Sequence, residues 1–267
     1  MKLLAIDMDE TCLNSKKQIS DINIRALKWA AQNGIAVVPA TGRCISCLPH
    51  QLKEEHFFHY VIASNGATVM DWDKKEVISR KNLMWKDAYL LLKECRHPGI
   101  GIAAHMGDEY YVQGKPLAAL GHAVYGKDAA GVKVVKNMAE EIIHQCDTVQ
   151  ELQLYFLNPE SRKIAERVVG KYEDAFSVAY TEKYAELYDK GVSKGYGLQQ
   201  LADRLQIKKE DIICIGDSTN DLSMFEVAGT KFAVGNALEE LKEKADHVVA
   251  TNDEDGVADA ILHYICC

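Results

Sequence analysis

Two aspartates, Asp7 and Asp9, stand at the end of a short apolar segment near the start of the chain. Residues 2–6 are typical of a strand buried on both faces, because their hydrophobicity is continuous rather than alternating. Residues i and i+2 of an extended chain project to the same side, so the two carboxylates can face one ligand. A magnesium ion held by oxygen ligands would keep one aspartate ionised as a nucleophile, while the other, partly protonated, could act as a general acid. Solvated acids at a strand end are the alternative interpretation of this pattern taken alone.

A second apolar segment, residues 35–40, is followed by Thr41, Gly42 and Arg43. A hydroxyl, a glycine that lets backbone N–H groups come close, and a guanidinium could all bind an oxyanion. A simple strand-ending turn is the other interpretation of these residues.

Polar side chains also follow the later apolar segments. Residues 60–63 form a third predicted strand, which ends in the sequence Ser-Asn-Gly at 64–66, and Lys194 opens a predicted helix. The apolar run 211–215 leads into a polar cluster that contains Asp217, Asn220 and Asp221. Open α/β sheets bind ligands at the carboxyl ends of their strands, so we expect these groups to converge there.

The elements around these residues predict a core that is interrupted by an insert. Ser20 is a suitable N-cap for the first helix, which Gly34 would close. From about Leu83 the pattern changes to short alternating strands with interspersed helices, and strand–helix alternation returns near residue 189. We therefore predict an α/β fold with a doubly wound parallel-sheet core at 1–82 and 189–267, and an inserted α+β domain at 83–188.

Length and composition narrow the class of protein. The chain has 267 residues, a formal net charge of −8 and no runs of Lys or Arg, which argues against a nucleic-acid partner. No stretch approaches the ~18 apolar residues needed to span a bilayer, so we expect a cytoplasmic protein without a membrane partner. The eight cysteines, Cys266 and Cys267 among them, are scattered, which favours reduced thiols over a disulfide scaffold or a zinc site.

The order of the polar segments resembles that of the haloacid dehalogenase (HAD) superfamily. Its four motifs are Asp-x-Asp-x-Thr, a strand-ending Thr or Ser, a Lys, and Gly-Asp-x-x-x-Asp. The insert between the second and third motifs, Ser-Asn-Gly-Ala at 64–67 and Gly-Val-Ser-Lys-Gly at 191–195 are similar to the Cof-type sugar-phosphatase branch. The resemblance implies a Rossmann-like core and an inserted cap domain.

The resemblance also implies roles for the acidic residues. Asp7 matches the nucleophile that forms an aspartyl-phosphate, and Asp9 matches the acid/base that protonates the leaving oxygen and then activates water. The magnesium ligands would be Asp7, the backbone carbonyl of Asp9, and Asp217, with Asp221 as a supporting carboxylate. This cation would offset the negative charge that the phosphoryl group brings to an anionic nucleophile.

The phosphoryl group itself would be held by four further residues: Thr41, Gly42, Lys194 and Asn220. We therefore predict a magnesium-dependent phosphatase that hydrolyses a small phosphomonoester, such as a sugar phosphate, through an aspartyl-phosphate. The substrate's identity and the oligomeric state do not follow from the sequence.

Two motifs depart from the family pattern. Glu10 stands where the first motif usually has Gly, and Ser218 and Thr219 stand where the fourth motif frequently has Gly-Glu, which is the milder change. The side chain of Glu10 makes positive φ costly and adds a third carboxylate. Two alternative functions stay open: a phosphomutase of the same superfamily, and a non-enzymatic phospholigand-binding protein, which Glu10 alone favours. A dinucleotide-binding domain is disfavoured, since no Gly-x-Gly-x-x-Gly follows the first strand.

Overall fold

We describe residues 1–265 of a computed structural model of the chain, without the side chains of residues 124 and 125. The thiols predicted at Cys266 and Cys267 lie outside the described residues. The chain divides into two compact units. The first unit comprises Met1–Gly42, Pro49–Arg80 and Ser193–Cys267, and the second comprises Arg43–Leu48 and Lys81–Val192.

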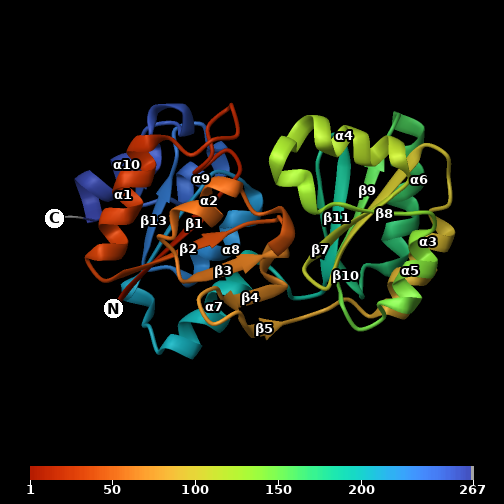
Figure 1. Ribbon diagram of the computed structural model, residues 1–267, viewed down its shortest axis with the longest axis horizontal. Coiled ribbons are helices and arrows are strands. Elements are labelled where there is room, and N and C mark those ends of the chain that lie inside the picture. The colour runs from red at the N-terminus through yellow and green to blue at the C-terminus, as the bar shows by residue number, and fades with distance from the viewer. Residues whose placement is uncertain (266–267) are drawn as a thin grey trace. The chain divides into compact units, whose positions relative to one another are not determined.

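The first unit contains an eight-stranded sheet with the order β14-β13-β12-β1-β2-β3-β4-β5 (Figure 1). The six strands from β14 to β3 are parallel, whereas β4 is antiparallel to β3 and β5 is antiparallel to β4. The strands are β1 (Lys2–Asp7), β2 (Ile35–Ala40), β3 (Tyr60–Ala63), β4 (Thr68–Asp71), β5 (Glu76–Arg80), β12 (Ile212–Gly216), β13 (Thr230–Ala233) and β14 (His247–Val248).

Helices of the first unit pack on this sheet and on one another. The helices are α1 (Asp21–Gln32), α2 (His50–Glu55), α7 (Lys194–Leu205), α8 (Leu222–Val227), α9 (Glu239–Lys244) and α10 (Gly256–Ala260). α1 packs against β2 and α10, whereas α7 packs against α8 and strands β3 to β5. The predicted N-cap of α1 is confirmed, because the Ser20 hydroxyl accepts a hydrogen bond from the backbone N–H of Asn23.

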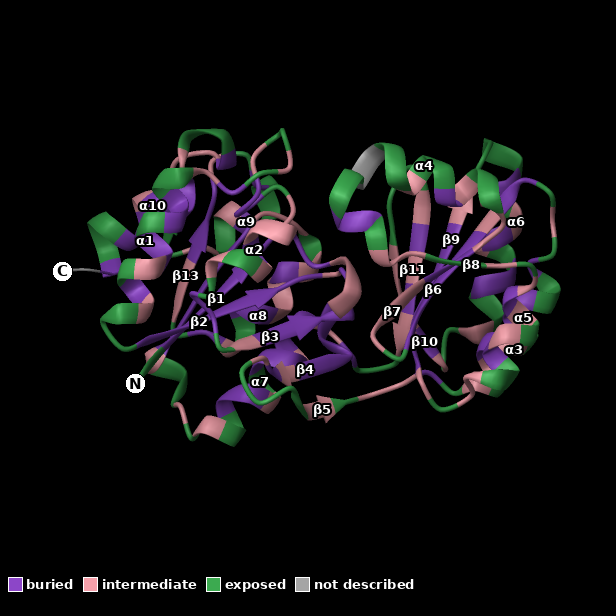
Figure 2. Ribbon diagram, in the orientation of Figure 1, coloured by how far each residue is buried: buried purple, intermediate pink, exposed green. Residues whose placement is uncertain are grey.

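Strand β1 lies between β12 and β2, and its residues from Leu3 to Asp7 are buried (Figure 2). Continuous burial explains why these residues are apolar without alternation. In the register of the parallel strands Asp7 lies beside Ala40, and Ile6 lies beside Ile215. The residues that follow these three strands therefore begin at one edge of the sheet.

The second unit contains a six-stranded sheet with the order β10-β11-β9-β6-β7-β8. Its strands are β6 (Ile100–Met106), β7 (Glu109–Gln113), β8 (Lys133–Val135), β9 (Val149–Phe156), β10 (Phe176–Tyr180) and β11 (Tyr184–Asp189). Its helices are α3 (Trp85–Glu94), α4 (Lys115–Tyr125), α5 (Met138–His144) and α6 (Pro159–Val169). Apolar residues of α3, α5 and α6 form one buried cluster with alternate residues of β6, β9 and β11, such as Leu91, Leu152 and Leu187. This unit is therefore an α+β arrangement with its own core.

Three elements of the second unit, α4, β8 and β11, were not among those predicted. α4 has Gly114 at its N-cap and Gly121 in its interior, so it lacks both a capping side chain and a strong helix pattern. The segment 43–48 also belongs to this unit, because a buried Arg43 Nη1–Asp128 Oδ2 ion pair of 2.8 Å joins the two residues. Among residues 1–265, no helix is long and apolar enough to cross a membrane.

Candidate active site

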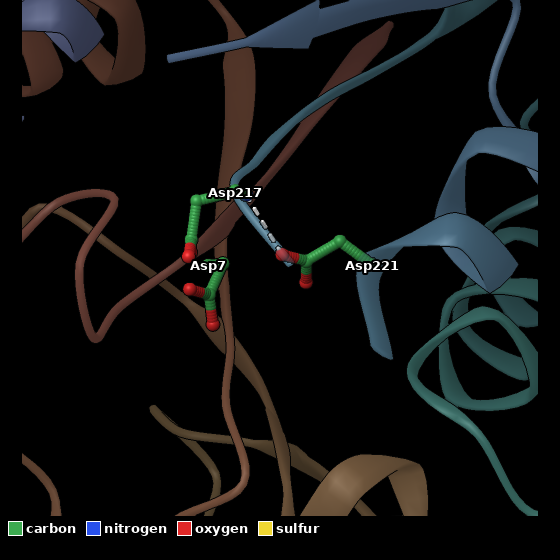
Figure 3. A group of neighbouring side chains, drawn as sticks. All are labelled: Asp7, Asp217 and Asp221. Atoms are coloured by element: carbon green, nitrogen blue, oxygen red, sulfur yellow. Dashed lines mark hydrogen bonds between the residues drawn. The ribbon is translucent and has the colours of Figure 1, made fainter. Parts of the chain in front are cut away.

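Three carboxylates of the first unit converge at the carboxyl edge of its parallel sheet (Figure 3). Asp7 ends β1, Asp217 directly follows β12, and Asp221 ends the short 3-10 turn Thr219–Asp221. One oxygen from each lies within 4.8 Å of the others. These are the three acidic side chains that the sequence predicted around the metal.

The buried ammonium of Lys194 joins two of these carboxylates. Lys194 is the first residue of α7, whose N-cap Ser193 accepts a hydrogen bond from the backbone N–H of Tyr196. Its Nζ donates to Asp7 Oδ1 at 2.5 Å and to Asp221 Oδ1 at 2.7 Å, and the side chain is 1 % exposed. Burial opposes its charge, but the carboxylates of Asp221 and Asp7 outweigh burial and raise the pKa of Lys194.

The carboxylates carry more negative charge than Lys194 can balance. Burial raises the pKa of Asp7 well above its usual value; Lys194 opposes this shift, and Asp221 and Asp217 add to it. Burial and the charge of Asp221 likewise raise the pKa of Asp217. Three ionised carboxylates and one ammonium leave a formal charge of −2. Hard oxygen donors with this charge suit a divalent cation such as Mg²⁺.

Asp221 is held by hydrogen bonds to the backbone of the neighbouring loop and to Lys194. Its Oδ2 accepts hydrogen bonds from the backbone N–H groups of Asp217, at 2.9 Å, and Ser218, at 3.1 Å. Its Oδ1 accepts from Lys194, so both carboxylate oxygens have partners within the protein. Asp221 therefore holds the loop that carries Asp217.

Asp9 lies apart from this group of side chains. Its side chain is 34 % exposed, and its Oδ1 lies 3.7 Å from the ammonium of Lys17. The three side chains that could share a metal are Asp7, Asp217 and Asp221. The Asp9 carboxylate is therefore not part of this three-carboxylate group.

Glu10 adopts the left-handed backbone conformation that was expected to be costly, with a φ of 62°. Such a conformation costs a non-glycine residue roughly 1–2 kcal/mol. The Glu10 carboxylate bonds with Lys17 at 2.6 Å, and Asn236 Nδ2 donates to its backbone oxygen at 2.8 Å. The loop that contains Glu10 thus adopts a left-handed turn although this residue has a side chain.

The predicted phosphate-binding residues lie on neighbouring loops. Thr41 is buried after β2, and its backbone N–H donates to Ile62 O at 2.9 Å. Asn220 precedes Asp221, and its Nδ2 donates to Asn65 Oδ1 at 3.3 Å. Gly42 also lies against Asn65, since a β-carbon added to Gly42 would lie 3.3 Å from the Asn65 amide.

Two residues of the site, Thr11 and Ser223, make contacts that were not predicted from the sequence. The hydroxyl of Thr11 donates to Asp217 Oδ1 at 2.7 Å and is buried. The sequence signal for this contact was the Thr that ends the Asp-x-Asp-x-Thr motif. Ser223 Oγ accepts from the backbone N–H of Gly195 and donates to Asn220 O, both at 3.0 Å, and no sequence pattern marks this residue.

Comparisons with known proteins agree with this fold. The chain is 33 % identical to the phosphatase YwpJ of Bacillus subtilis over 99 % of its length and all of that protein. It is 31 % identical to the 5-amino-6-(5-phospho-D-ribitylamino)uracil phosphatase YwtE of the same organism, over 97 % of this chain and 96 % of the other. A haloacid dehalogenase-like hydrolase from Bacteroides thetaiotaomicron superposes with a TM-score of 0.86 at 27 % identity, covering 97 % of this chain and 98 % of the other.

The predicted α/β fold and the family resemblance are thus confirmed. The pattern of the haloacid dehalogenase-like hydrolase family matches residues 4–261, which is nearly the whole chain. The protein therefore belongs to the haloacid dehalogenase-like hydrolase family, as an enzyme of its phosphatase branch.

Proposed function

We propose that this chain is a magnesium-dependent phosphatase that hydrolyses a small phosphomonoester, such as a sugar phosphate, through an aspartyl-phosphate on Asp7. The observation that carries the proposal is the position of Asp7. Its carboxylate ends the central strand β1, contacts the ammonium of Lys194, and lies within 4.8 Å of the Asp217 carboxylate. An anionic nucleophile in such a position is suited to attack an electrophile that a cation has neutralised.

The residues present fit a magnesium ion. Asp7 and Asp217 would hold it together with the backbone carbonyl of Asp9, and Asp221 would support them through its hydrogen bonds to the 217–218 backbone. When bound, the ion would neutralise the charge of the phosphoryl oxygens and orient them for in-line attack.

Asp7 and Asp9 would carry the covalent chemistry. A carboxylate oxygen of Asp7 attacks phosphorus, the bond from phosphorus to the leaving oxygen breaks, and that oxygen takes a proton from Asp9. Asp9 then accepts a proton from a water molecule whose oxygen attacks the aspartyl-phosphate. This second attack breaks the bond to Asp7 and releases inorganic phosphate.

Fixed donors would hold the phosphoryl oxygens during both steps. Lys194 provides a buried ammonium. Thr41 provides a hydroxyl, Gly42 provides its backbone N–H, and Asn220 provides a side-chain amide. Because these donors are held by the fold, they need no reorganisation when charge develops.

The substrate is expected to be small. A relative of this chain acts on a phosphoribityl compound, as its name states, which is a phosphomonoester of a polyhydroxylated chain. We further propose that the second unit acts as a cap domain that selects the leaving group, in the manner expected for residues 83–188 from the family resemblance. The partners would then be phosphorylated metabolites.

A panel of phosphorylated metabolites, assayed for phosphate release with and without magnesium, tests the function. We expect release from one or more sugar or polyol phosphates, dependent on magnesium and abolished by EDTA. Isomerised sugar phosphate without inorganic phosphate would identify a phosphomutase instead. Tight binding of a phosphorylated ligand without turnover would identify a binding protein.

Replacing Asp9 with Asn should lower kcat by roughly 10²–10⁴-fold, because the amide cannot transfer a proton. The magnesium concentration for half-maximal activity should change little, since the proposed ligand at this position is the backbone carbonyl. Residual kcat and a magnesium titration measure the two effects. Loss of magnesium dependence with proton transfer intact would contradict the assignment.

Replacing Asp217 with Ala should raise the magnesium requirement on the order of 10–100-fold, because a carboxylate ligand is lost and Thr11 loses its acceptor. Calorimetric titration of the variant with magnesium measures the effect. Saturation at the wild-type concentration would mean that the metal binds elsewhere.

A further inference from the structure

The loop that follows β3 holds an unusual backbone conformation. Ser64, Asn65 and Gly66 are consecutive and all have positive φ, of 48°, 52° and 97°. Asn tolerates this region better than most residues, but the conformation is still unfavourable for any residue with a side chain. Strain of this kind persists only where surrounding contacts require it, so the contacts of this loop are informative.

One set of contacts joins the loop to the segment after β2. The backbone N–H of Asn65 donates to Thr41 O at 3.1 Å. The Asn65 amide also lies directly over Gly42, where a β-carbon would come within 3.3 Å of both its nitrogen and its oxygen. Asn65 thus binds the carbonyl oxygen of Thr41 through its backbone N–H and covers Gly42 with its side chain, and both are predicted phosphate-binding residues.

A second set of contacts joins the loop to the start of α7. A β-carbon on Gly66 would lie only 2.0 Å from the backbone oxygen of Ser193, so the two backbones touch. Ser193 caps α7 and directly precedes Lys194. The left-handed turn at 64–66 therefore brings the loop against the helix end that carries the buried ammonium.

A third contact fixes the orientation of Asn220. Asn220 Oδ1 accepts from the hydroxyl of Ser218 at 2.7 Å, and its Nδ2 donates to Asn65 Oδ1 at 3.3 Å. With its oxygen bound on one side and its nitrogen on the other, the Asn220 amide has one preferred orientation. Asn65 is buried, so water can reach this bond only from the side of Asn220, which is half-buried.

We infer that Asn65 is a positioning residue for phosphate binding: it locks the Asn220 amide and the Thr41–Gly42 segment in one arrangement relative to Lys194. The inference rests on the proposed function and concerns a residue that was not among the predicted catalytic, phosphate-binding or metal-binding residues. Asn65 would act through Asn220 and the backbone of Thr41, without itself touching the reacting atoms.

The Asn65→Gly variant isolates the side chain, because glycine keeps the left-handed backbone and its bond to Thr41 O. We expect kcat/KM to fall on the order of 10–100-fold, since small misplacement of binding groups has effects of this size. The Kd for inorganic phosphate, measured by calorimetry with magnesium present, should rise about tenfold. The melting temperature should fall by no more than about 4 °C.

A double-mutant cycle with Asn220→Ala separates positioning from general damage. If Asn65 acts through Asn220, the kcat/KM of the double variant should equal that of Asn220→Ala within about threefold. Any remaining difference would reflect the lost contact between Asn65 and Gly42. Gln206→Gly is the matched control. Gln206 is exposed, follows α7 and has a φ of 56°, so the variant introduces glycine at another left-handed position that is away from the site. Its activity should equal that of the wild type.

Several outcomes would overturn the inference. Wild-type activity and phosphate affinity in Asn65→Gly would do so, as would fully additive effects in the cycle. If the wild type hydrolyses no ester but binds phosphate, and Asn65→Gly loses that binding, the proposed function fails while the role of Asn65 stands. If the wild type neither hydrolyses an ester nor binds phosphate, both fail.

Discussion

Replacing Asp7 with Asn should abolish phosphate release from every ester that the wild-type chain hydrolyses, lowering kcat by roughly 10⁴-fold or more. The amide has nearly the same shape as the carboxylate but is a poor nucleophile and a weaker metal ligand. The fold should persist, because Lys194 keeps Asp221 as a partner and one buried carboxylate is removed from a crowded site. Initial rates of phosphate release and a thermal melt measure the two properties.

A matched control for this variant is Asp174→Asn, which makes the same chemical change at an exposed residue of the second unit. It should keep wild-type activity. Activity of Asp7→Asn within about tenfold of the wild type would remove Asp7 from its proposed role. A variant that is inactive because it is unfolded would be recognised from its circular dichroism spectrum.

Replacing Lys194 with Met should cost both activity and stability. The change keeps an unbranched apolar side chain of similar length but leaves the buried carboxylates of Asp7 and Asp221 without their cation. Breaking a buried ion pair by removing one partner typically costs 3–5 kcal/mol, and we expect the free energy of unfolding to fall by about that amount. Phosphate release should fall at least 10²-fold, because a fixed cation at the phosphoryl group is lost. Urea denaturation and initial rates measure these effects.

The stability loss in Lys194→Met should depend on pH. Burial already raises the pKa of Asp7, and Lys194 is the main group that opposes the shift, so its removal raises that pKa further. The folded variant then holds a proton that the unfolded chain releases above pH about 4. Stability contributed by such a group declines as pH rises from the unfolded pKa to the folded one, and the decline continues to a higher pH in the variant. The deficit relative to the wild type should therefore grow as pH rises above the wild-type pKa of Asp7.

Magnesium should restore part of the stability of Lys194→Met, because a cation held by Asp7 and Asp217 offsets the same charge. Lys163→Met, at an exposed residue of α6, is the control and should change neither property. A deficit below about 1 kcal/mol at pH 7 without magnesium would show that the ammonium does not balance the buried carboxylates.

Much of the core was predictable because its signals are local. The apolar runs that become β1, β2 and β12 end at the residues where hydrophobicity stops, so Asp7, Thr41 and Asp217 could be assigned to strand ends. Lys194 was predicted to open a helix, and it is the first residue of α7, which Ser193 caps. Elements with weak local patterns, such as α4 with its internal glycine, could not be delimited in this way.

The sequence by itself determined the fold class and the acidic and basic side chains at the strand ends, because buried strands and their ends can be predicted from the hydrophobic pattern. It also indicated the family, through the resemblance of its four motifs. Only the tertiary structure decided how these groups meet. The Lys194 bonds to Asp7 and Asp221 span 187 and 27 residues, and the contact of Asn65 with Asn220 spans 155. Left-handed backbone at Glu10 and Asn65 is likewise stabilised by distant contacts, such as those to Asn236 and Asn220, rather than by local preference. Such contacts depend on which loops the folded sheet brings together, and no local pattern encodes that.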